Sequence, residues 1–203
     1  HRSVATIVAQ VDAMKTLVNE FRDYARLPTA HPQPLTLEAL VSEVLSLYGQ
    51  PQETGRLMAR FEPSLPPILG DATQLRQVVH NLVQNALDAV ADLPQGRVEV
   101  TVEASRSDEG AVRWVRLVVV DNGPGFAEHV LKRAFEPYVT TKSKGTGLGL
   151  AVVKKIADEH HARLRVTNLH ANADGSGLPT GARVSLSFSP MTSSAIPATP
   201  LNS

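Results

Sequence analysis

The chain has 203 residues, 42% of them hydrophobic, which is enough for one sizeable core with segments left outside it. Twenty basic residues balance twenty acidic ones, so no overall field draws the protein to nucleic acid or to an anionic membrane surface. The lack of cysteine excludes disulfides, thiolate nucleophiles and cysteine metal sites. No apolar run approaches the roughly 20 residues that span a bilayer, and no signal peptide opens the chain, so we expect a soluble polypeptide.

The first 27 residues carry apolar side chains at alternating steps of three and four, the spacing of a heptad seam. The seam consists of Val4, Ile7, Val11, Met14, Val18, Phe21 and Ala25. This spacing predicts a helix that pairs with another helix, although an amphipathic helix packed on its own domain would look similar. Prolines at 28, 32 and 34 separate the helix from the downstream residues, which favours pairing. We therefore expect a stem helix over residues 1–27 and a linker over 28–34.

Residues 35–190 read as one domain of alternating helices and strands. Helices are predicted over residues 35–48, from a cap at Asp71 or Thr73 to Val90, and over 148–160. Strands are predicted over 57–61, 97–104, 112–120, 164–168 and 182–188, with a hairpin between the second and third and a doubly buried run at 117–120. This order predicts an α/β fold, a two-layer sandwich of helices on one sheet. Residues 191–203, rich in Ser, Thr, Pro and Ala, are predicted to be disordered.

Two asparagines, Asn81 and Asn85, interrupt the apolar pattern of the long central helix. Residues four apart share a helix face, so both amides project together. An asparagine oxygen can ligate Mg²⁺, an ion that keeps several waters and bridges nucleotide phosphates. Two asparagines that merely face solvent would give the same pattern, so the pair needs companions before it indicates a site.

A second cluster, Asp121-Asn122-Gly123-Pro124-Gly125, directly follows the buried run. A carboxylate at the end of a central strand can accept a hydrogen bond from the exocyclic amine of adenine. The glycines let the backbone come close to a flat base because they carry no Cβ. An ordinary tight turn would use the same residues, so this cluster too is ambiguous alone.

A third cluster, Lys144-Gly-Thr-Gly-Leu-Gly-Leu150, opens the last predicted helix. Its free amide N–H groups and the positive helix end suit an anion, and Lys142 adds charge. No Walker lysine follows it and no strand directly precedes it, which argues against the P-loop and Rossmann motifs. The segment 126–143 between the two glycine clusters is long enough to form a mobile cover over a ligand, anchored by the sequence FEPY.

Taken in order, NLVQNALDA, DNGPGF, FEPYVTTK and KGTGLGLAVVKKI resemble the asparagine, first glycine, phenylalanine and second glycine boxes of histidine kinases. YVTTKSKGTGLGLAVVKKIADEH is most similar to nitrogen-regulation sensor kinases of the NtrY type, and EFRDYARLP is similar to the end of their second stem helix. The resemblance implies the Bergerat ATPase fold, ATP and Mg²⁺ as ligands, and a place in two-component signal transduction. It also implies a response regulator as partner, a homodimer through the stem helix, and the cytoplasmic portion of an inner-membrane sensor kinase.

The resemblance further implies roles for single residues. Asn85 would ligate Mg²⁺, Asn81 would lie near the phosphates, and Asp121 would read adenine in a pocket shaped by Gly123 and Gly125. The residues against the triphosphate would be Lys142, Gly145, Thr146, Gly147, Leu148 and Gly149, and Thr180 would lie near the base. Many family members have a basic residue at the position of Asp88. An acidic residue there is closer to the pattern of gyrase-like and Hsp90-like relatives, so the resemblance does not say how Asp88 meets the phosphates.

Three functions compete. The first is a kinase module that binds Mg·ATP and donates the γ-phosphoryl group to a stem histidine for relay to a response regulator. The second is an ATP hydrolase, but hydrolases of this superfamily place a glutamate base four residues before the Mg²⁺ asparagine, where this chain has Asn81. The third is a nucleotide-sensing or dimerising module without chemistry.

The histidines give little support for a phosphoacceptor within these residues. His1 lacks the acidic neighbour that the family's acceptor has. His80 is predicted to be a partly buried helix histidine, or else a partner of the site. His160, His161 and His170 are expected to be surface residues, and none of the histidines has convincing metal-ligand spacing.

Overall fold

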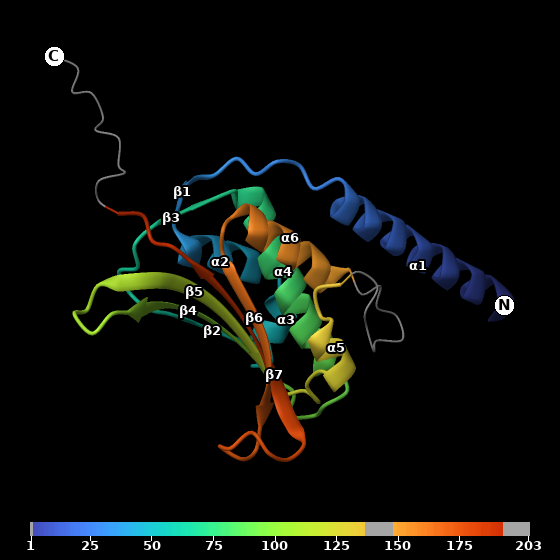
Figure 1. The fold of residues 1–203 in the computed structure, drawn as a ribbon. Helices are drawn as coiled ribbons and strands as arrows, with labels where there is room; N and C mark the ends of the chain where they lie inside the picture. Colours follow the sequence, from blue (N-terminus) through green and yellow to red (C-terminus); the bar gives the residue numbers. More distant parts are fainter. Residues whose placement is uncertain (1, 137–147, 193–203) are drawn as a thin grey trace.

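A computed structural model describes residues 2–136 and 148–192. A five-stranded mixed sheet, in the order β2-β4-β5-β7-β6, carries helices on one face (Figure 1). The helices are α1 (Arg2–Ala25), α2 (Leu37–Leu45), α3 (Gly49–Glu53), α4 (Ala72–Ala89), α5 (Glu128–Lys132) and α6 (Gly149–Glu159). The strands are β1 (Gln33–Leu35), β2 (Leu57–Phe61), β3 (Ile68–Gly70), β4 (Val98–Arg106), β5 (Val112–Asp121), β6 (Arg163–His170) and β7 (Pro179–Phe188). The predicted two-layer α/β sandwich is therefore confirmed.

The predicted strands are all present, and the structure adds two short ones. β2 has the predicted bounds, and β4 and β5 form the predicted antiparallel hairpin. β6 and β7 are longer than predicted, because polar and glycine positions at their ends take part in the ladder. β1 and β3 form a separate two-stranded sheet. Residues 33–34, predicted as linker, and Leu35, predicted to begin a helix, therefore form a strand, and the helix begins at Leu37.

The core lies between the sheet and the helices. Val98, Val100 and Val102 of β4 are fully buried, and they stand opposite Asp121, Val119 and Leu117 of β5 on the same face. Each fully buried valine or leucine here stabilises the fold by roughly 1.5–3 kcal/mol. This burial of alternate residues on one face explains why the alternating apolar pattern of β4 could be recognised as a strand in the sequence.

The opposite face of the sheet is polar. Glu103 lies within ion-pair distance of Arg116 and Arg183, and Arg163 stacks over Trp114. Val118, in the run predicted to be doubly buried, is 4% exposed on this face, whereas Val120 is half-buried. The central strand is thus covered on its second face by its neighbours' side chains and not by a second helical layer.

Helix α4 begins at a charged cap. Asp71 is the N-cap, and its Oδ1 accepts a hydrogen bond from the Gln74 N–H at 3.1 Å, so Asp71 and not Thr73 fills the predicted role. Burial acts to raise the pKa of the Asp71 carboxyl, but backbone N–H donors, among them those of His31 and Gln74, and the nearby His160 outweigh it and lower that pKa.

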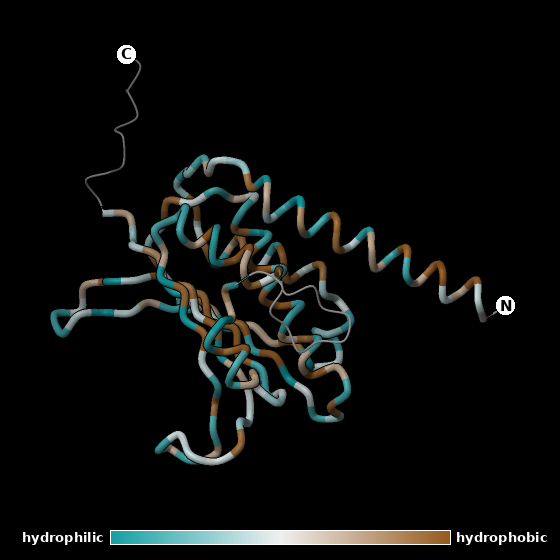
Figure 2. Tube along the Cα trace, turned by 45° about the vertical axis from the view of Figure 1, so that its right-hand side comes forward, coloured by the Kyte–Doolittle hydropathy of each residue, from teal (hydrophilic) through white to brown (hydrophobic). Residues whose placement is uncertain are grey.

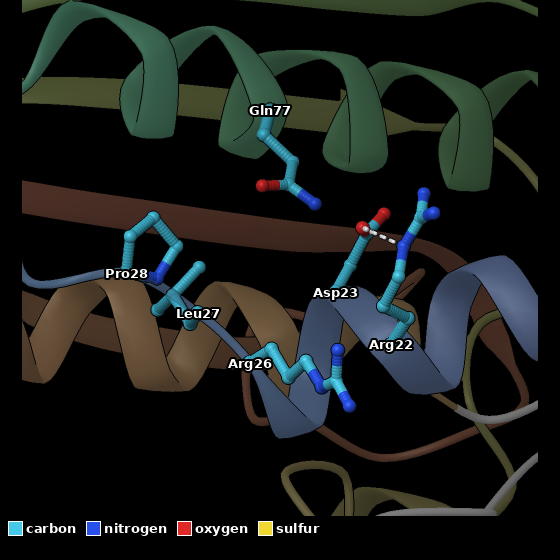
Figure 3. Close-up of a pocket in the computed structure, with 6 residues that line it drawn as sticks. All are labelled: Arg22, Asp23, Arg26, Leu27, Pro28 and Gln77. Carbon is cyan, nitrogen blue, oxygen red and sulfur yellow. Dashed lines mark ion pairs between the residues drawn. The ribbon is translucent and has the colours of Figure 1, made fainter.

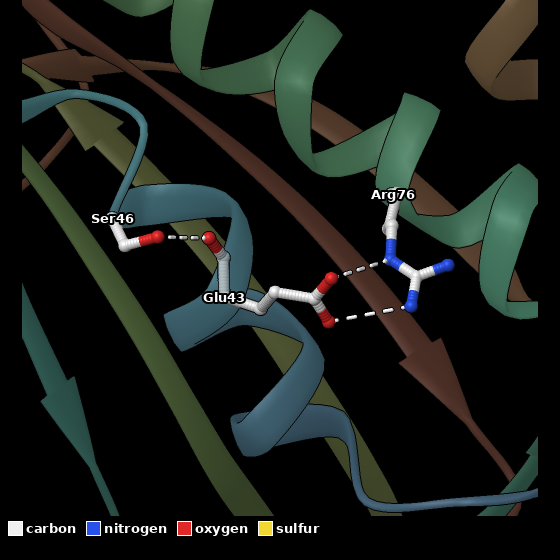
Figure 4. Close-up of polar contacts among 3 residues, drawn as sticks. All are labelled: Glu43, Ser46 and Arg76. Carbon is white, nitrogen blue, oxygen red and sulfur yellow. Dashed lines mark hydrogen bonds and ion pairs between the residues drawn. The ribbon is translucent and has the colours of Figure 1, made fainter.

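Helices α2 and α4 are joined at the surface by an ion pair. Arg76 on α4 contacts both carboxylate oxygens of Glu43 on α2, at 3.2 and 3.3 Å, and Ser46 donates to the Glu43 carbonyl at 2.6 Å (Figure 4). Both charged side chains are largely exposed, so the pair contributes at most about 1 kcal/mol. The apolar side chains that α2 buries, and not this pair, therefore hold the helix against the core.

Helix α1 projects away from the domain, and its seam is uncovered (Figure 1). Val4, Ile7, Val11, Met14, Val18 and Phe21 are between 44% and 65% exposed. Figure 2 shows the apolar positions recurring along the whole helix. An amphipathic helix packed on its own domain would bury these residues, so the structure removes that alternative.

The end of α1 and the following linker are held against α4 and α6. Lys155 of α6 donates to the Tyr24 carbonyl at 2.7 Å and lies 4.4 Å from the centre of the Tyr24 ring. Gln74 of α4, only 3% exposed, donates to the Pro28 carbonyl at 2.7 Å. The His31 N–H donates to Asp71 at 2.9 Å. We call these three contacts the stem latch.

A small cavity lies beside the stem latch. It measures about 180 Å³ and is lined by Arg22, Asp23, Arg26, Leu27, Pro28 and Gln77, with Gln77 reaching from α4 toward the end of α1 (Figure 3). None of these residues belongs to the predicted site. The end of α1 therefore contacts the domain through the polar contacts of the stem latch and through Tyr24 and Leu27, which pack against the edge of the core.

Candidate functional site

The two asparagines of α4 meet the first turn of α6. The Asn81 amide donates to the Gly149 carbonyl at 3.4 Å. A Cβ on Gly149 would lie 3.3 Å from the Asn85 side-chain nitrogen, so the glycine allows the close approach. Leu148, the N-cap of α6, is fully buried and anchors this end. The structure thus brings the asparagine box against a helix N-terminus, whose first N–H groups lack intrahelical partners.

Asp121 ends β5 on the helix-covered face and is 7% exposed. Among its contacts, Oδ1 accepts a hydrogen bond from the Gly123 N–H at 2.9 Å. A Cβ on Gly123 would lie 2.9 Å from the Ala89 carbonyl oxygen at the end of α4. The turn after Asp121 is therefore packed onto the same helix that carries Asn81 and Asn85.

Glycines at two further positions shape this region. A Cβ on Gly181 would lie 2.1 Å from the Asp121 carbonyl oxygen, so a larger residue there would collide with the backbone. Thr180, beside it in β7, is exposed. Gly125 has a φ of +72°, a conformation that favours glycine. Predicted site residues from two distant motifs, Asp121 and Thr180, thus lie on neighbouring strands.

One contact was missed by the sequence analysis. Asn168 of β6 hydrogen-bonds both backbone groups of Phe126, each at 2.8 Å. The only signal in the sequence was a polar residue in a predicted strand, which does not say which strand or turn that residue faces. Asn168 can therefore be assigned to the site only once the folded structure is known.

Asp88 and His80 lie at the exposed side of α4. Asp88 accepts a hydrogen bond from Gln84 at 2.9 Å. The Tyr48 hydroxyl lies 2.5 Å from His80 Nδ1. Burial, and then the charge of Asp88, raise the pKa of Tyr48 to about 12, so the phenol stays neutral beside the imidazole. His80 is thus an exposed helix histidine held by Tyr48, not the partly buried residue that was predicted.

The prediction for His160 was wrong. It is half-buried, its Nε2 accepts the Asp71 N–H at 2.9 Å, and its Nδ1 donates to the Ile156 carbonyl at 2.8 Å. Its position just after α6 looked like an exposed helix end, but tertiary packing places it over the start of α4. His161 is exposed, as predicted, and His170 ends β6 half-buried.

Several predicted site residues lie outside the described residues. They are Lys142, Gly145, Thr146 and Gly147, together with residues 137–143 of the predicted cover. The described part of the cover contains α5, which was not predicted and which buries Val130. The predicted tail lies outside the described residues from 193 onward.

The metal ligands available among the described residues suit a hard cation that is held mainly by the phosphates of a nucleotide. Within residues 2–136 and 148–192, no group of three His, Asp or Glu side chains could hold a metal. Asn81 and Asn85 offer neutral amide oxygens instead, and Mg²⁺ takes one or two protein oxygens plus phosphate oxygens and waters. The residues therefore fit Mg²⁺ as a nucleotide-bound ion.

The family described as histidine kinase-, DNA gyrase B- and HSP90-like ATPase matches residues 70–192. The chain belongs to this family. The match includes the asparagine pair, Asp121, the glycine clusters and Asn168, and relatives named as sensor histidine kinases confirm the resemblance to histidine kinases. In the described part of the chain, no helix is both long and apolar enough to cross a bilayer.

Relatives of this ATPase-family chain are named as sensor kinases. It is 33% identical over 164 residues to a putative NtrY-like sensor histidine kinase of Rickettsia felis, covering 80% of this chain and 26% of the relative. It is 34% identical to the nitrogen regulation protein NtrY of Azorhizobium caulinodans, covering 76% and 20%. It is 33% identical to the sensor histidine kinase ZraS of Escherichia coli K12, covering 87% and 36%. The chain thus spans about a fifth to a third of these relatives.

Solved structures agree with the family assignment. The catalytic domain of histidine kinase ThkA matches with a TM-score of 0.63 and 26% identity, covering 79% of this chain and 96% of ThkA's domain. Full-length ShkA in complex with AMPPNP matches with a TM-score of 0.67 and 28% identity, covering 95% of this chain and 40% of ShkA. The predicted histidine-kinase ATPase fold is confirmed.

Proposed function

We propose that the chain is the catalytic ATP-binding part of a sensor histidine kinase of the NtrY type. In this role it binds ATP with Mg²⁺ and donates the γ-phosphoryl group to a histidine on the stem, from which a response regulator takes it. The observation that carries the proposal is the meeting of Asn81 and Asn85 with the Gly149 end of α6, with Asp121 at the far end of α4. One helix, α4, thus joins the phosphate end to the base end.

Each residue has a distinct part in this proposal. The Asp121 carboxylate accepts a hydrogen bond from the adenine amine, and such a bond to a charged acceptor is worth about 1.5–3 kcal/mol. The N–H groups at the start of α6 face the phosphates. Asn85 would supply one oxygen to Mg²⁺, which neutralises phosphate charge. Gly123, Gly125 and Thr180 would form the border of the base pocket.

The competing hydrolase function lacks a base at the expected position. Asn81 stands four residues before Asn85, and its amide donates to the Gly149 carbonyl. An amide cannot take a proton from water, so this position gives no general-base catalysis. Transfer to a placed histidine needs positioning and charge neutralisation instead, which the site supplies.

The deciding experiment is D121N. The amide presents a donor where adenine also presents one, so affinity for ATP should fall tenfold to a hundredfold. Binding is measured by titration calorimetry, with D108N on the exposed β4–β5 hairpin as control. Unfolding temperature checks that D121N is folded. Unchanged affinity for ATP in folded D121N would contradict the proposal that Asp121 binds adenine.

The stem provides the proposed dimer contact. The uncovered seam of α1 should pair with the same seam of a second copy, because an apolar stripe along one face of a helix is stable only when covered. The relatives' names support a sensor role, and we propose a cytoplasmic position below an inner-membrane sensor. Sedimentation over a range of concentrations tests pairing, with V11K as the variant that should abolish it.

A further inference from the structure

The turn after Asp121 is fixed by a side chain that lies outside all four motif boxes. Asn168 of β6 accepts a hydrogen bond from the Phe126 N–H and donates one to the Phe126 carbonyl, both at 2.8 Å. A single amide thus satisfies both backbone groups of one residue, as a neighbouring strand would. The two residues are 42 positions apart, so only the folded sheet brings them together.

The sheet register aligns this amide with Asp121. Asp121 pairs with Ala182, and Ala182 pairs with Asn168, so the three stand in one row across β5, β7 and β6. Side chains of directly opposite residues emerge on the same face. Asn168 therefore stands on the helix-covered face, two strands or about 10 Å from Asp121. Asp121 holds one end of the turn through Gly123, and Asn168 holds the other through Phe126.

Between these two anchors the turn has little room to move. Gly125 has a φ of +72°, and a Cβ there would lie 2.9 Å from the Asn168 side-chain oxygen and 2.7 Å from Pro179 Cβ. Gly125 thus has no room for a side chain, because its backbone lies close to Asn168 of β6 and Pro179 of β7. Gly125 therefore packs directly against the Asn168 side chain, so removing that side chain takes away a packing contact of the turn as well as its two hydrogen bonds.

We propose that Asn168 is a positioning residue for nucleotide binding, whose amide holds the turn of residues 123–126 as a preformed wall of the base pocket. The proposal rests on the proposed function, since it concerns the same pocket. Without the two bonds, the Phe126 backbone groups would bond water and the turn would sample other conformations. The base would then have to order the turn on binding, and that ordering reduces affinity.

The test compares N168A with N172A. Asn172 also makes one side-chain hydrogen bond, to Ser176 at 2.8 Å, but lies in the exposed β6–β7 loop. N168A should bind ATP about tenfold more weakly than wild type, the effect of losing one to two backbone-directed hydrogen bonds, and N172A should bind as wild type does. Hydrogen exchange gives the local readout. In N168A the Phe126 amide should exchange faster, while the Gly123 amide, bonded to Asp121, should keep its protection.

A second variant separates the two bonds. N168D keeps an acceptor for the Phe126 N–H but presents an oxygen to the Phe126 carbonyl, so it should protect the amide and still weaken ATP binding. It also carries the test if N168A does not fold. Wild-type affinity in N168A or N168D, or a loss of protection spread over the whole sheet, would overturn the positioning role. Wild-type protein that binds no ATP would instead contradict the proposed function itself.

Discussion

At the scale of single residues, Asn85 gives a test of metal binding that is separate from base binding. N85A removes an amide oxygen next to the start of α6 and leaves Asp121 in place. We expect affinity for Mg·ATP to fall much more than affinity for ATP measured with a chelator, because only the first complex uses the amide oxygen. Titration calorimetry with and without Mg²⁺ measures both. Equal losses in the two conditions would contradict a metal role for Asn85.

The Asp71 carboxylate predicts a pH dependence of stability. Its pKa is lowered in the folded state, so its contribution is fully present above the ordinary value and is lost as pH falls through the lowered one. D71A should therefore lower the free energy of unfolding by about 1 kcal/mol at pH 7, the cost of losing an N-cap. The gap to wild type should begin to shrink below about pH 4 and continue to shrink as pH falls through the lowered pKa, as measured by urea unfolding. A gap that does not shrink on acidification, or an equal loss in T73A, would show that Asp71 is not the effective cap.

Which residues could be read from the sequence depends on how local their partners are. Asn81, Asn85 and Asp71 are recognisable because helix periodicity and capping act over three or four residues. Asn168 and His160 are not, because their partners are 42 and 89 positions away. Local rules assign such residues to a strand or a helix end, and only tertiary packing gives them a role.

At the scale of elements, the stem latch should fix the direction of α1. K155M removes both the bond to the Tyr24 carbonyl and the contact with its ring. K154M is the matched control, because Lys154 pairs with Asp158 one turn away on the same helix. Since the chain has no cysteine, two introduced cysteines at Lys15 and Glu109 can carry spin labels cleanly. The distance distribution between them should broaden in K155M and not in K154M, and equal distributions would contradict the latch.

Elements with regular apolar spacing were predicted well, and short ones were not. α4 and β2 follow from their patterns, whereas β1 has three residues and contains Pro34. Proline normally argues against a strand, but β1 pairs only with β3, so its other edge needs no N–H donor. α5 has five residues, too few for a helical pattern to be distinguished from a loop.

At the scale of the whole molecule, the order of the strands in the sheet could not be predicted from the sequence. β2 pairs parallel with β4 across the intervening α4, and β5 pairs with β7 instead of with the next strand in the chain. Alternating apolar residues indicate that a strand has one buried face, but they do not indicate which strand lies beside it. The layer arrangement can be predicted from the order of elements, and the neighbours cannot.

The whole chain should bind ATP without labelling itself. The side chain of His80, next to Asn81 in sequence, is held by Tyr48, and that of His160 is held at the start of α4 by Asp71. We expect neither to attack a γ-phosphate in line, because that reaction needs a nucleophile positioned for it and these side chains are engaged elsewhere. Incubation with γ-labelled ATP and an alkaline quench should give no label, and a separate stem with an acidic-flanked histidine should become labelled in trans. Stoichiometric, acid-labile labelling of this chain alone would contradict the prediction.

Helix α6 connects the asparagine pair with the stem latch. Its first residue, Gly149, contacts Asn81, and Lys155 and His160 at its other end contact the stem side of the molecule. Eleven residues of helix span about 16 Å and move as a rigid rod. If a nucleotide displaces the first turn, the far end moves with it, and the latch is strained or relieved. Thermodynamic linkage then makes the effect reciprocal: whatever factor the nucleotide applies to the stem orientation, a signal that turns the stem applies to nucleotide affinity.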